Sequence, residues 1–336
     1  MIRRALVLAF LSAPCALSAQ YSITHHYVIG GGGGWDYVVP DTTRHRLFIG
    51  RSDRVMVVDE LTGKLLGEVK GIHGAHGTAI DERSGHGFAT SGDDSSIVMF
   101  DLRTFKHLGV AHAAEDADAI IFDPASKRVF SFNGDAHSAT VVNPATGRFV
   151  KNIDLGGKPE YGVAAGDGFV YVNLTDKSEV VEIDGRAMTV LRRWSTAPCG
   201  QPVAMAIDRA HRRLLSGCRS GVMAVSDIAA GRIVATVAIG QGTDGAAFDP
   251  ATGNAFASNA DGTLTIIHQD TPDTYHVLQT VQTMPGSRNM GFDPVTHRAY
   301  LVGARMGPPP AEATKDNPRK RPQVLPATFE VMVVGK

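Results

Sequence analysis

Residues 41–64 read DTTRHRLFIGRSDRVMVVDELTGK, and this stretch decides the fold. It holds an Asp, a short turn, an apolar strand, a polar loop, and a second apolar strand that again ends in Asp. The same frame recurs about every 42 residues, seven times along the chain. A repeat of this length with four short strands per unit is typical of a β-propeller. We therefore expect an all-β, seven-bladed β-propeller of four-stranded blades.

Two Asp positions mark the units. The first anchor precedes the turn and comprises Asp41, Asp81, Asp123, Asp208, Asp249 and Asp293, with Ala165 in this place in the fourth unit. The second anchor follows the third strand and comprises Asp59, Asp101, Asn143, Asp184 and Asp227. Asp and Asn suit these places because their side chains accept hydrogen bonds from backbone N–H groups two residues on. The anchors thus set the register of each unit.

The seventh unit ends early, because its third strand, residues 328–334, is followed by the chain end without a fourth strand. Residues 22–29 have strand character and precede the first unit. We expect this N-terminal segment to supply the missing outer strand of the last blade and to close the ring, which removes exposed sheet edges. Residues 20–336 then form a single domain, with a Pro-rich and charged loop inserted at 306–327. That loop is either a solvated excursion or a lid or docking arm.

The N-terminus reads as an export signal. Arg3 and Arg4 precede an apolar stretch and the small-residue region Leu17-Ser18-Ala19, which predicts cleavage after Ala19. The alternative of lipid attachment at Cys15 fits its preceding residues poorly. Residues 1–19 are therefore expected to be a signal peptide, and the mature chain to be periplasmic or secreted. Its apolar stretch is too short to span a membrane.

Two cysteines, Cys199 and Cys218, remain after this cleavage and flank one hairpin of the fifth unit. If Asp208 pairs with Arg213, Cys218 falls opposite Val203, close to the end of the loop that carries Cys199. An oxidising compartment favours a disulfide between them. Free buried thiols are the alternative, and a metal pair lacks His or Cys at a zinc-like spacing nearby.

Charge excludes some functions. The whole chain has a net charge of −1, and without residues 1–19 it keeps 31 basic against 34 acidic residues, a net charge of −3. A near-neutral chain has no broad electrostatic attraction for nucleic acid or anionic lipid. A local basic patch is still compatible with these numbers.

The frame from Arg46-Leu47-Phe48 to Lys64 and the run from Ala206 to Leu214 resemble the YVTN-repeat proteins, in particular the YncE-like seven-bladed propellers. The Gly-rich run Gly33–Tyr37 and the Cys199/Cys218 pair are also similar to this group. The resemblance covers nearly all of the mature chain and implies the fold. It implies no common reaction, because relatives include DNA-binding proteins, and similar propellers include lactonases and quinoprotein subunits.

One set of residues recurs five places before the first anchor, where the innermost strand of each blade begins. The set is Asp36, His76, Asp118, Glu160, Val203, Asp244 and Arg288, and Tyr37, Tyr161 and Asn289 come one place later. Because the innermost strands of a propeller line one channel, we expect these side chains to meet at one opening. The predicted ligand-binding face is Asp36, Tyr37, His76, Asp118, Glu160, Tyr161, Asp244, Arg288 and Asn289.

Carboxylates forced together repel, which raises their pKa values or attracts a cation. Oxygen ligands suit Ca²⁺ or Mg²⁺, and a histidine admits zinc, copper or manganese. The metal set would be Asp36, His76, Asp118, Glu160 and Asp244. The other interpretations are a pocket for a polar small molecule, or a wet channel mouth neutralised by Arg288 and solvent.

We expect a monomeric, non-catalytic binding or scaffold protein whose acidic channel mouth holds a ligand, a divalent metal ion or a periplasmic protein partner. The alternative is a metal-dependent hydrolase of the lactonase type, in which Asp36, His76 or Glu160 acts on water near a bound cation. A further alternative, implied by the resemblance, is single-strand DNA binding, with the basic run Arg319–Arg321 contacting phosphates.

Overall fold

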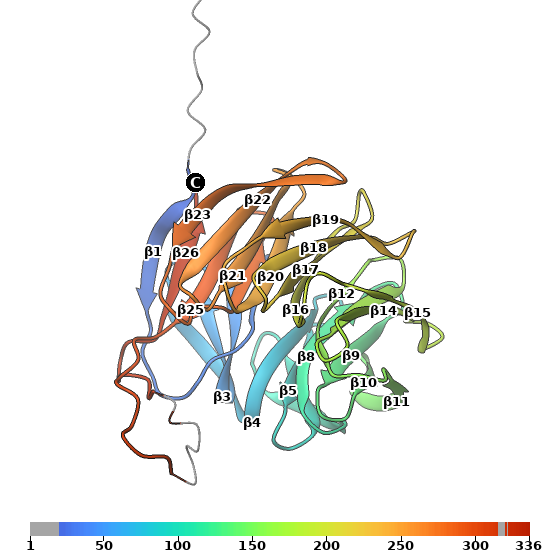
Figure 1. The fold of residues 1–336 in the computed structure, drawn as a ribbon. Helices are drawn as coiled ribbons and strands as arrows, with labels where there is room; N and C mark the ends of the chain where they lie inside the picture. The colour runs from blue at the N-terminus through green and yellow to red at the C-terminus, as the bar shows by residue number, and fades with distance from the viewer. Residues whose placement is uncertain (1–19, 315–319, 321) are drawn as a thin grey trace, which may run out of the picture.

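The strands of this chain form antiparallel sheets arranged around a central axis, as a computed structural model shows (Figure 1). The structure describes residues 20–314, 320 and 322–336. The export signal expected in residues 1–19 therefore lies outside the described residues, as do Arg319 and Arg321. Within the described part of the chain, no helix has the length and apolar character needed to cross a bilayer.

Six sheets contain all the named strands. The first has six strands in the order β2 (Val38–Asp41), β3 (Arg46–Asp59), β4 (Leu65–Asp81), β5 (His86–Ser91), β6 (Ser96–Asp101) and β7 (His107–His112). The next two sheets are β8 (Ala117–Asp123), β9 (Arg128–Asn133), β10 (Ser138–Asn143), β11 (Arg148–Asp154), and β12 (Pro159–Ala164), β13 (Phe169–Leu174), β14 (Glu179–Asp184), β15 (Thr189–Ser195). Then follow β16 (Pro202–Asp208), β17 (Arg213–Cys218), β18 (Val222–Asp227), β19 (Arg232–Ala238), and β20 (Thr243–Asp249), β21 (Asn254–Asn259), β22 (Thr263–Thr271), β23 (Thr274–Gln282). The last sheet joins β24 (Met290–Asp293), β25 (Arg298–Gly303) and β26 (Glu330–Gly335) to β1 (Ser22–Val28).

The expected count of seven separate blades is wrong, because the first two repeat units share one sheet. β4 is a single strand of 17 residues that runs from the outer edge of one unit to the innermost position of the next. Its two halves both pair with β3, through Arg54 with Lys70 and Ser52 with Ala75. The linking residues include Gly71 and Gly74, which both have a positive φ, and they stay hydrogen-bonded, with the His73 N–H donating to Ser91 Oγ at 2.9 Å. The result is a propeller of six sheets, five with four strands and one with six.

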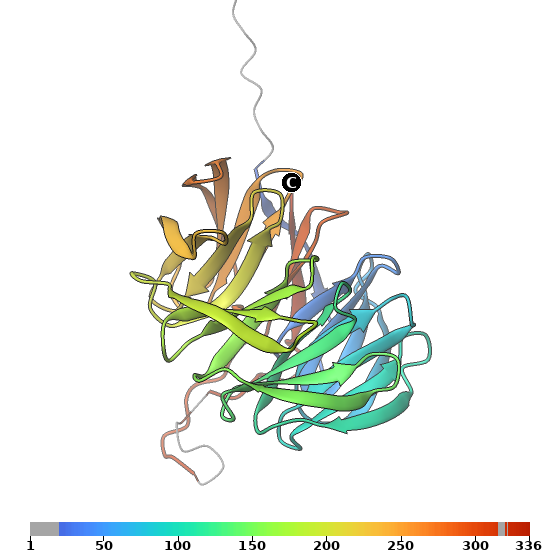
Figure 2. The ribbon, with the colours of Figure 1, turned by 90° about the vertical axis from the view of Figure 1, so that its right-hand side faces the viewer.

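The ring is closed as expected by the N-terminal segment. β1 pairs antiparallel with β26, from Ser22 opposite Gly335 to Val28 opposite Glu330, and occupies the outer edge of the last sheet. The innermost strand of that sheet, β24, contacts β2 of the first sheet. The last and first sheets therefore lie side by side (Figures 1 and 2).

The first-anchor Asp residues hydrogen-bond to the turns that follow them, as their chemistry predicts. Each first-anchor Asp that the sequence singled out is buried. Its carboxylate accepts backbone hydrogen bonds of the turn that follows, as Asp123 Oδ2 does from Ser126 N at 2.9 Å and Asp293 Oδ1 from Val295 N at 2.8 Å. The fourth residue after each anchor has a positive φ: His45, Gly85, Lys127, Arg212, Gly253 and His297. The Asp side chain thus stabilises a turn that ends in the left-handed region.

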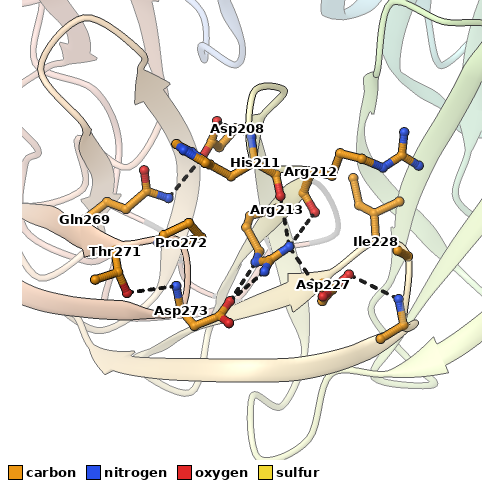
Figure 3. A network of polar contacts seen from close by, with 12 residues as sticks. Asp208, His211, Arg212, Arg213, Asp227, Ile228, Gln269, Thr271, Pro272 and Asp273 are labelled. Atoms are coloured by element: carbon orange, nitrogen blue, oxygen red, sulfur yellow. Dashed lines mark hydrogen bonds and ion pairs between the residues drawn. The ribbon is translucent and has the colours of Figure 1, made fainter.

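Polar contacts also join neighbouring sheets at the anchor ends of the strands (Figure 3). Arg213 on β17 lies between Asp227 of its own sheet, at 3.4 Å, and Asp273 of the β22–β23 hairpin, at 2.7 Å. Gln269 donates to Asp208 Oδ2 at 2.9 Å across the same boundary. The innermost strands run from the candidate site to these anchors, so this network lies at the opposite end of the strands from the site.

Candidate functional site

Five of the seven residues at the predicted sequence offset lie where the innermost strands are interrupted by β-bulges. The register shifts between Ala75 and Thr78, between Ala117 and Ile120, and between Pro159 and Gly162. It shifts again between Pro202 and Ala204, and between Thr243 and Gly245. These bulges hold His76, Asp118, Glu160, Val203 and Asp244. A bulge re-aims its side chains out of the alternation of the strand, which explains why one sequence offset selects residues at a single rim.

Three of the predicted residues form a compact centre. His76 Nδ1 lies 2.7 Å from Asp36 Oδ2 and 3.4 Å from Asp118 Oδ1. One donor atom from each of the three residues lies within 4.8 Å of the others. The side chains of His76, Asp36 and Asp118 are 31%, 24% and 21% exposed, so solvent reaches the centre only in part. We call Asp36, His76 and Asp118 the acidic triad.

The ring of His76 is held by close packing against Gly92. A Cβ atom at Gly92 would lie 3.0 Å from His76 Nε2, so the absence of a side chain there makes room for the imidazole. This packing leaves Nδ1 directed at the two carboxylates. The orientation is set by the strand before it and by the glycine beside it.

The other two predicted carboxylates are paired with arginines and do not join the triad. Arg288 Nε lies 2.9 Å from Asp244 Oδ2, and Arg219 Nη2 lies 3.6 Å from Glu160 Oε1 and 3.8 Å from Asp244 Oδ1. The expected five-residue metal set therefore reduces to the triad as a geometric cluster. Glu160 and Asp244 form a second, charge-compensated half of the rim.

Arg219 was absent from the predicted face. It lies in the turn between β17 and β18, and it occupies the side of the rim where the fifth repeat contributes only the apolar Val203. The sequence does contain a signal for it, because Arg219 follows the second strand of its unit, and loops between second and third strands share one face with the starts of the innermost strands. Asn289 links the two halves of the rim, because its Nδ2 donates to Asp36 Oδ1 at 3.0 Å and to Asp244 Oδ2 at 3.3 Å.

Two tyrosines occupy the ring centre between opposite strands. Tyr37 precedes β2 and Tyr161 is in β12, and their ring centroids lie 5.2 Å apart. Tyr37 is 9% exposed. Burial, together with the charges of Asp118 and Asp36, raises the pKa of Tyr37 well above its ordinary value. The aromatic pair is therefore uncharged near neutral pH, and Tyr37 lies close to the carboxylates of the triad.

Three ionisable groups of the rim have raised pKa values. Burial raises the pKa of Asp118 well above its ordinary value, and the charge of Asp36 adds to this effect. Burial alone would lower the pKa of His76, but the hydrogen bond to Asp36 and the charge of Asp118 raise it to about 9. Burial raises the pKa of Glu160 to about 7, against the opposing effect of Arg219. A cation could replace protons that these groups hold near neutral pH.

Glu160 should make the stability of the folded chain depend on pH. Its carboxyl holds a proton more tightly in the folded chain, with a pKa of about 7 against an ordinary 4.5. Its stabilising contribution to the folded state is therefore full below pH 4.5 and is lost as the pH rises through 7. The Glu160→Gln variant stays neutral, and its free energy of unfolding should fall less than that of the wild type across this window. Urea unfolding at several pH values measures the difference. The same dependence of unfolding free energy on pH in the wild type and the variant would contradict this prediction. Glu115→Gln, at an exposed site, is the control.

An acidic pocket of about 550 Å³ opens onto the triad. His76 is part of its wall, and Asp93, Glu115, Asp116 and Asp135 supply further carboxylates. Lys158 is the nearby base, with Nζ 2.7 Å from Asp135 Oδ1 and 3.4 Å from Asp116 Oδ2. The pocket gives a cation in solvent a negatively charged approach to His76.

A buried arginine positions the segment that carries Asp36. Arg51 is 0% exposed, its Nε donates to Gly34 O at 2.9 Å, and its Nη2 donates to Gly32 O at 2.8 Å. Its guanidinium lies 3.6 Å from the centroid of the Phe329 ring. No carboxylate pairs with Arg51 in the described part of the chain. Backbone carbonyls and the aromatic face therefore compensate its charge.

The disulfide predicted from the sequence is present between Cys199 and Cys218, both 0% exposed, with Cα atoms 5.6 Å apart. Asp208 pairs with Arg213 as expected, but Cys218 lies opposite Pro202 and not Val203. The bulge at Val203 shifts the pairing by one residue. The bond fixes the loop before β16 to the end of β17, beside Arg219.

The double variant Cys199→Ala/Cys218→Ala should lose about 3 kcal/mol of unfolding free energy, because the bond closes a loop with a sequence separation of 19 residues. Urea unfolding of the wild type and the variant measures the difference. Under a reducing agent the wild type should approach the variant. A difference below about 1 kcal/mol would contradict the structural role that we assign to this bond.

Comparisons with known proteins identify the class by its fold. No family model matches the chain, and the search of curated proteins finds no match. Among solved structures, the chain is similar to one titled "Structure of U3-55K", with a TM-score of 0.74, 11% identity, and coverage of 93% of this chain and 98% of that chain. Likeness at this identity shows the fold alone. The protein is therefore a β-propeller with four-stranded antiparallel blades, and its assignment to the YVTN-repeat group stays a prediction.

Proposed function

We propose that this chain is an exported, non-catalytic binding protein that holds a divalent cation at the acidic triad. One observation carries the proposal: donor atoms of Asp36, His76 and Asp118 lie within 4.8 Å of one another. A bulge and the close approach of Gly92 orient His76 for this contact. A propeller fold is consistent with a binding or scaffold role, and the buried disulfide supports a location outside the cytoplasm.

The triad fits a cation by its donor chemistry. Asp118 Oδ1 is buried and makes no hydrogen bond, which is costly for a carboxylate oxygen unless a cation or a proton satisfies it. Distances of 2.7 and 3.4 Å between the imidazole and carboxylate atoms are close to the separations of ligand atoms around one small cation. A mixed imidazole and carboxylate set suits Zn²⁺ or Mn²⁺ better than Ca²⁺ or Mg²⁺.

Isothermal titration calorimetry of chelator-treated protein with Zn²⁺, Mn²⁺, Mg²⁺ and Ca²⁺ tests the proposal. We expect one Zn²⁺ or Mn²⁺ per chain, bound at least tenfold more tightly than Mg²⁺. Binding should release protons and strengthen as the pH rises from about 7 to about 9, because the imidazole must be deprotonated to act as a ligand. Absence of binding for all four ions would overturn the proposal.

A second candidate is a metal-dependent hydrolase of the lactonase type. The observation that favours it is Glu160, whose pKa of about 7 suits a general base at neutral pH. Three protein ligands would leave positions on a cation for water. Turnover of a panel of lactones, with and without chelator, separates the two functions. Lactone turnover that is lost when chelator is added would show that the chain is a metal-dependent enzyme.

Binding of single-stranded DNA has no support from the geometry of this face. Its carboxylates repel phosphates, and the tyrosines of the rim, Tyr37 and Tyr161, pack against each other. Lys320, the described member of the basic run, donates to Ala311 O at 2.8 Å. We therefore propose a cation as the ligand at the channel mouth, and not nucleic acid.

A further inference from the structure

A pocket of about 360 Å³ lies at the opposite end of the innermost strands from the triad. Asp81, which ends β4, and Phe122, which is the last residue but one of β8, are part of its wall. His86 Nδ1, at the start of β5, donates to Pro144 O at 3.0 Å and so joins two neighbouring sheets beside the pocket. The pocket therefore belongs to the boundary between these sheets and not to the acidic rim.

Three basic side chains and one carboxylate line this pocket. The bases are Arg83, Lys127 and Arg128, and the carboxylate is Asp81, so three positive charges less one negative charge leave the wall with a net charge of +2. In the described part of the chain, none of the three bases forms an ion pair with a carboxylate. Asp81 is 7% exposed, and its Oδ1 accepts a hydrogen bond from the Arg83 backbone N–H at 3.2 Å. The excess positive charge favours a ligand that carries about two negative charges.

Arg128 lacks the carboxylate that its counterpart in another repeat unit has. Arg213 starts β17 and pairs at 3.4 Å with Asp227, which ends β18 (Figure 3). Arg128 starts β9 in the same way, but β10 ends in Asn143. Among the described residues the Arg128 guanidinium makes one hydrogen bond, from Nη1 to Lys127 O at 2.9 Å, and its Nε is buried without a partner. The protein therefore leaves the charge of Arg128 uncompensated at the wall of this pocket.

The rest of the pocket wall is largely apolar. It includes Phe122, Pro124, Pro144 and Ala145. Phe122 is partly buried and packs against the hydrophobic core of its boundary. Sites for small molecules combine apolar walls with a few polar or charged groups, and their volumes start at about 300 Å³. A volume of about 360 Å³ therefore suits a ligand with a small apolar body as well as a charged group.

We propose that this pocket binds a phosphate monoester with a small apolar body. The phosphate group contacts Arg83, Lys127 and Arg128, and the apolar body packs against Phe122 and Pro144. A phosphate monoester carries a charge of about −1.5 to −2 at neutral pH, which matches the net charge of the wall. Arginine side chains suit this group because they donate paired hydrogen bonds to phosphate oxygens. The ligand is held without covalent chemistry, and its binding is independent of a cation at the triad.

Four probes test the proposal by calorimetry on the full chain. Phenyl phosphate carries the ring and the dianion, inorganic phosphate carries the dianion alone, benzoate carries the ring and a single negative charge, and phenol carries the ring alone. We expect phenyl phosphate to bind at least about tenfold more tightly than each of the other three, and to bind more weakly as the salt concentration rises. Equal or tighter binding of any of the other three probes, or no binding of phenyl phosphate, would overturn the proposal.

The Asn143→Asp variant tests the site without removing any base. It supplies to Arg128 the carboxylate that Asp227 supplies to Arg213, and it should weaken phenyl phosphate binding at least about tenfold. An aspartate can keep the turn, because Asn143 Oδ1 accepts a hydrogen bond from the Ala145 N–H at 2.9 Å and a carboxylate oxygen accepts in the same way. Thermal unfolding checks that the variant is folded. A folded variant with wild-type affinity would contradict the proposed site.

A pair of arginine variants locates the ligand independently. Arg128→Gln removes the uncompensated charge and should also weaken phenyl phosphate binding at least about tenfold. Arg298→Gln is the matched control, because Arg298 starts β25 as Arg128 starts β9, is also half-buried, and does not line the pocket. The control should change the affinity less than about twofold. Equal effects of the two variants would show that binding depends on overall charge, and this result would overturn the proposal.

Discussion

The Asp118→Asn variant is expected to bind Zn²⁺ at least a hundredfold more weakly than the wild-type chain, because one of three protein ligands becomes a neutral amide. Losing even an outer-sphere partner of a metal ligand costs about 10-fold to 100-fold in affinity, and losing a ligand costs more. Burial already raises the pKa of Asp118 well above its ordinary value, so a neutral amide should be tolerated in the fold. Calorimetry measures the affinity and thermal unfolding checks the fold.

Asp116→Asn is the matched control for this experiment. Asp116 lies two residues away in the acidic pocket, its carboxylate pairs with Lys158, and it is not part of the triad. Its φ of 61° lies in the left-handed region, which asparagine adopts readily. The control should keep Zn²⁺ affinity within about tenfold of the wild type, since only a more distant charge is lost. Equal losses in the two variants would point to general electrostatics and away from ligation by Asp118.

The Arg51→Leu variant should lose about 3 kcal/mol of unfolding free energy, because the buried guanidinium loses its hydrogen bonds to three backbone carbonyls, and hydrogen bonds of charged groups contribute about 1.5–3 kcal/mol each. Arg51 donates to Gly32, Gly33 and Gly34, and these glycines precede Trp35 and Asp36. Freeing this segment should also weaken Zn²⁺ binding at least tenfold, since Asp36 is no longer held against His76. Urea unfolding and calorimetry measure the two effects.

Arg83→Leu provides the comparison, because Arg83 is exposed and its removal should change stability by less than about 0.5 kcal/mol. Arg51→Lys keeps the charge but lacks the planar fork that reaches several carbonyls, so it should fall between the leucine variant and the wild type. If Arg51→Leu binds Zn²⁺ as the wild type does, the Gly-rich segment does not depend on Arg51 for its position.

The sequence offset that defines the candidate rim coincides with a structural feature that is itself repeated. The innermost strands carrying His76, Asp118, Glu160 and Asp244 each have a bulge at the same place, so one offset from the anchor Asp identifies side chains on one rim. The anchors are predictable for the same reason, since a local turn needs its Asp. Features that have a local cause and recur in every repeat unit can therefore be predicted from the sequence.

Features that depend on a single place in the chain were not predictable. Two repeat units merge in one sheet because β4 continues through Gly71 and Gly74, which both have a positive φ, where the other units break. The loop that carries Arg219 recurs in every unit, but the sequence does not show that this side chain reaches Glu160 and Asp244. The one-residue error at Cys218 arises from a bulge that pairing from the anchor alone cannot detect.

Anomalous diffraction from crystals soaked in Mn²⁺ would locate a cation bound at the acidic triad. We expect one strong peak among His76 Nδ1 and the carboxylate oxygens of Asp36 and Asp118, at about 2.0–2.3 Å from each, as is usual for such ligands. A map with no peak at this position, or with its strongest peak beside Glu160 and Asp244 instead, would show that the triad is not the cation site.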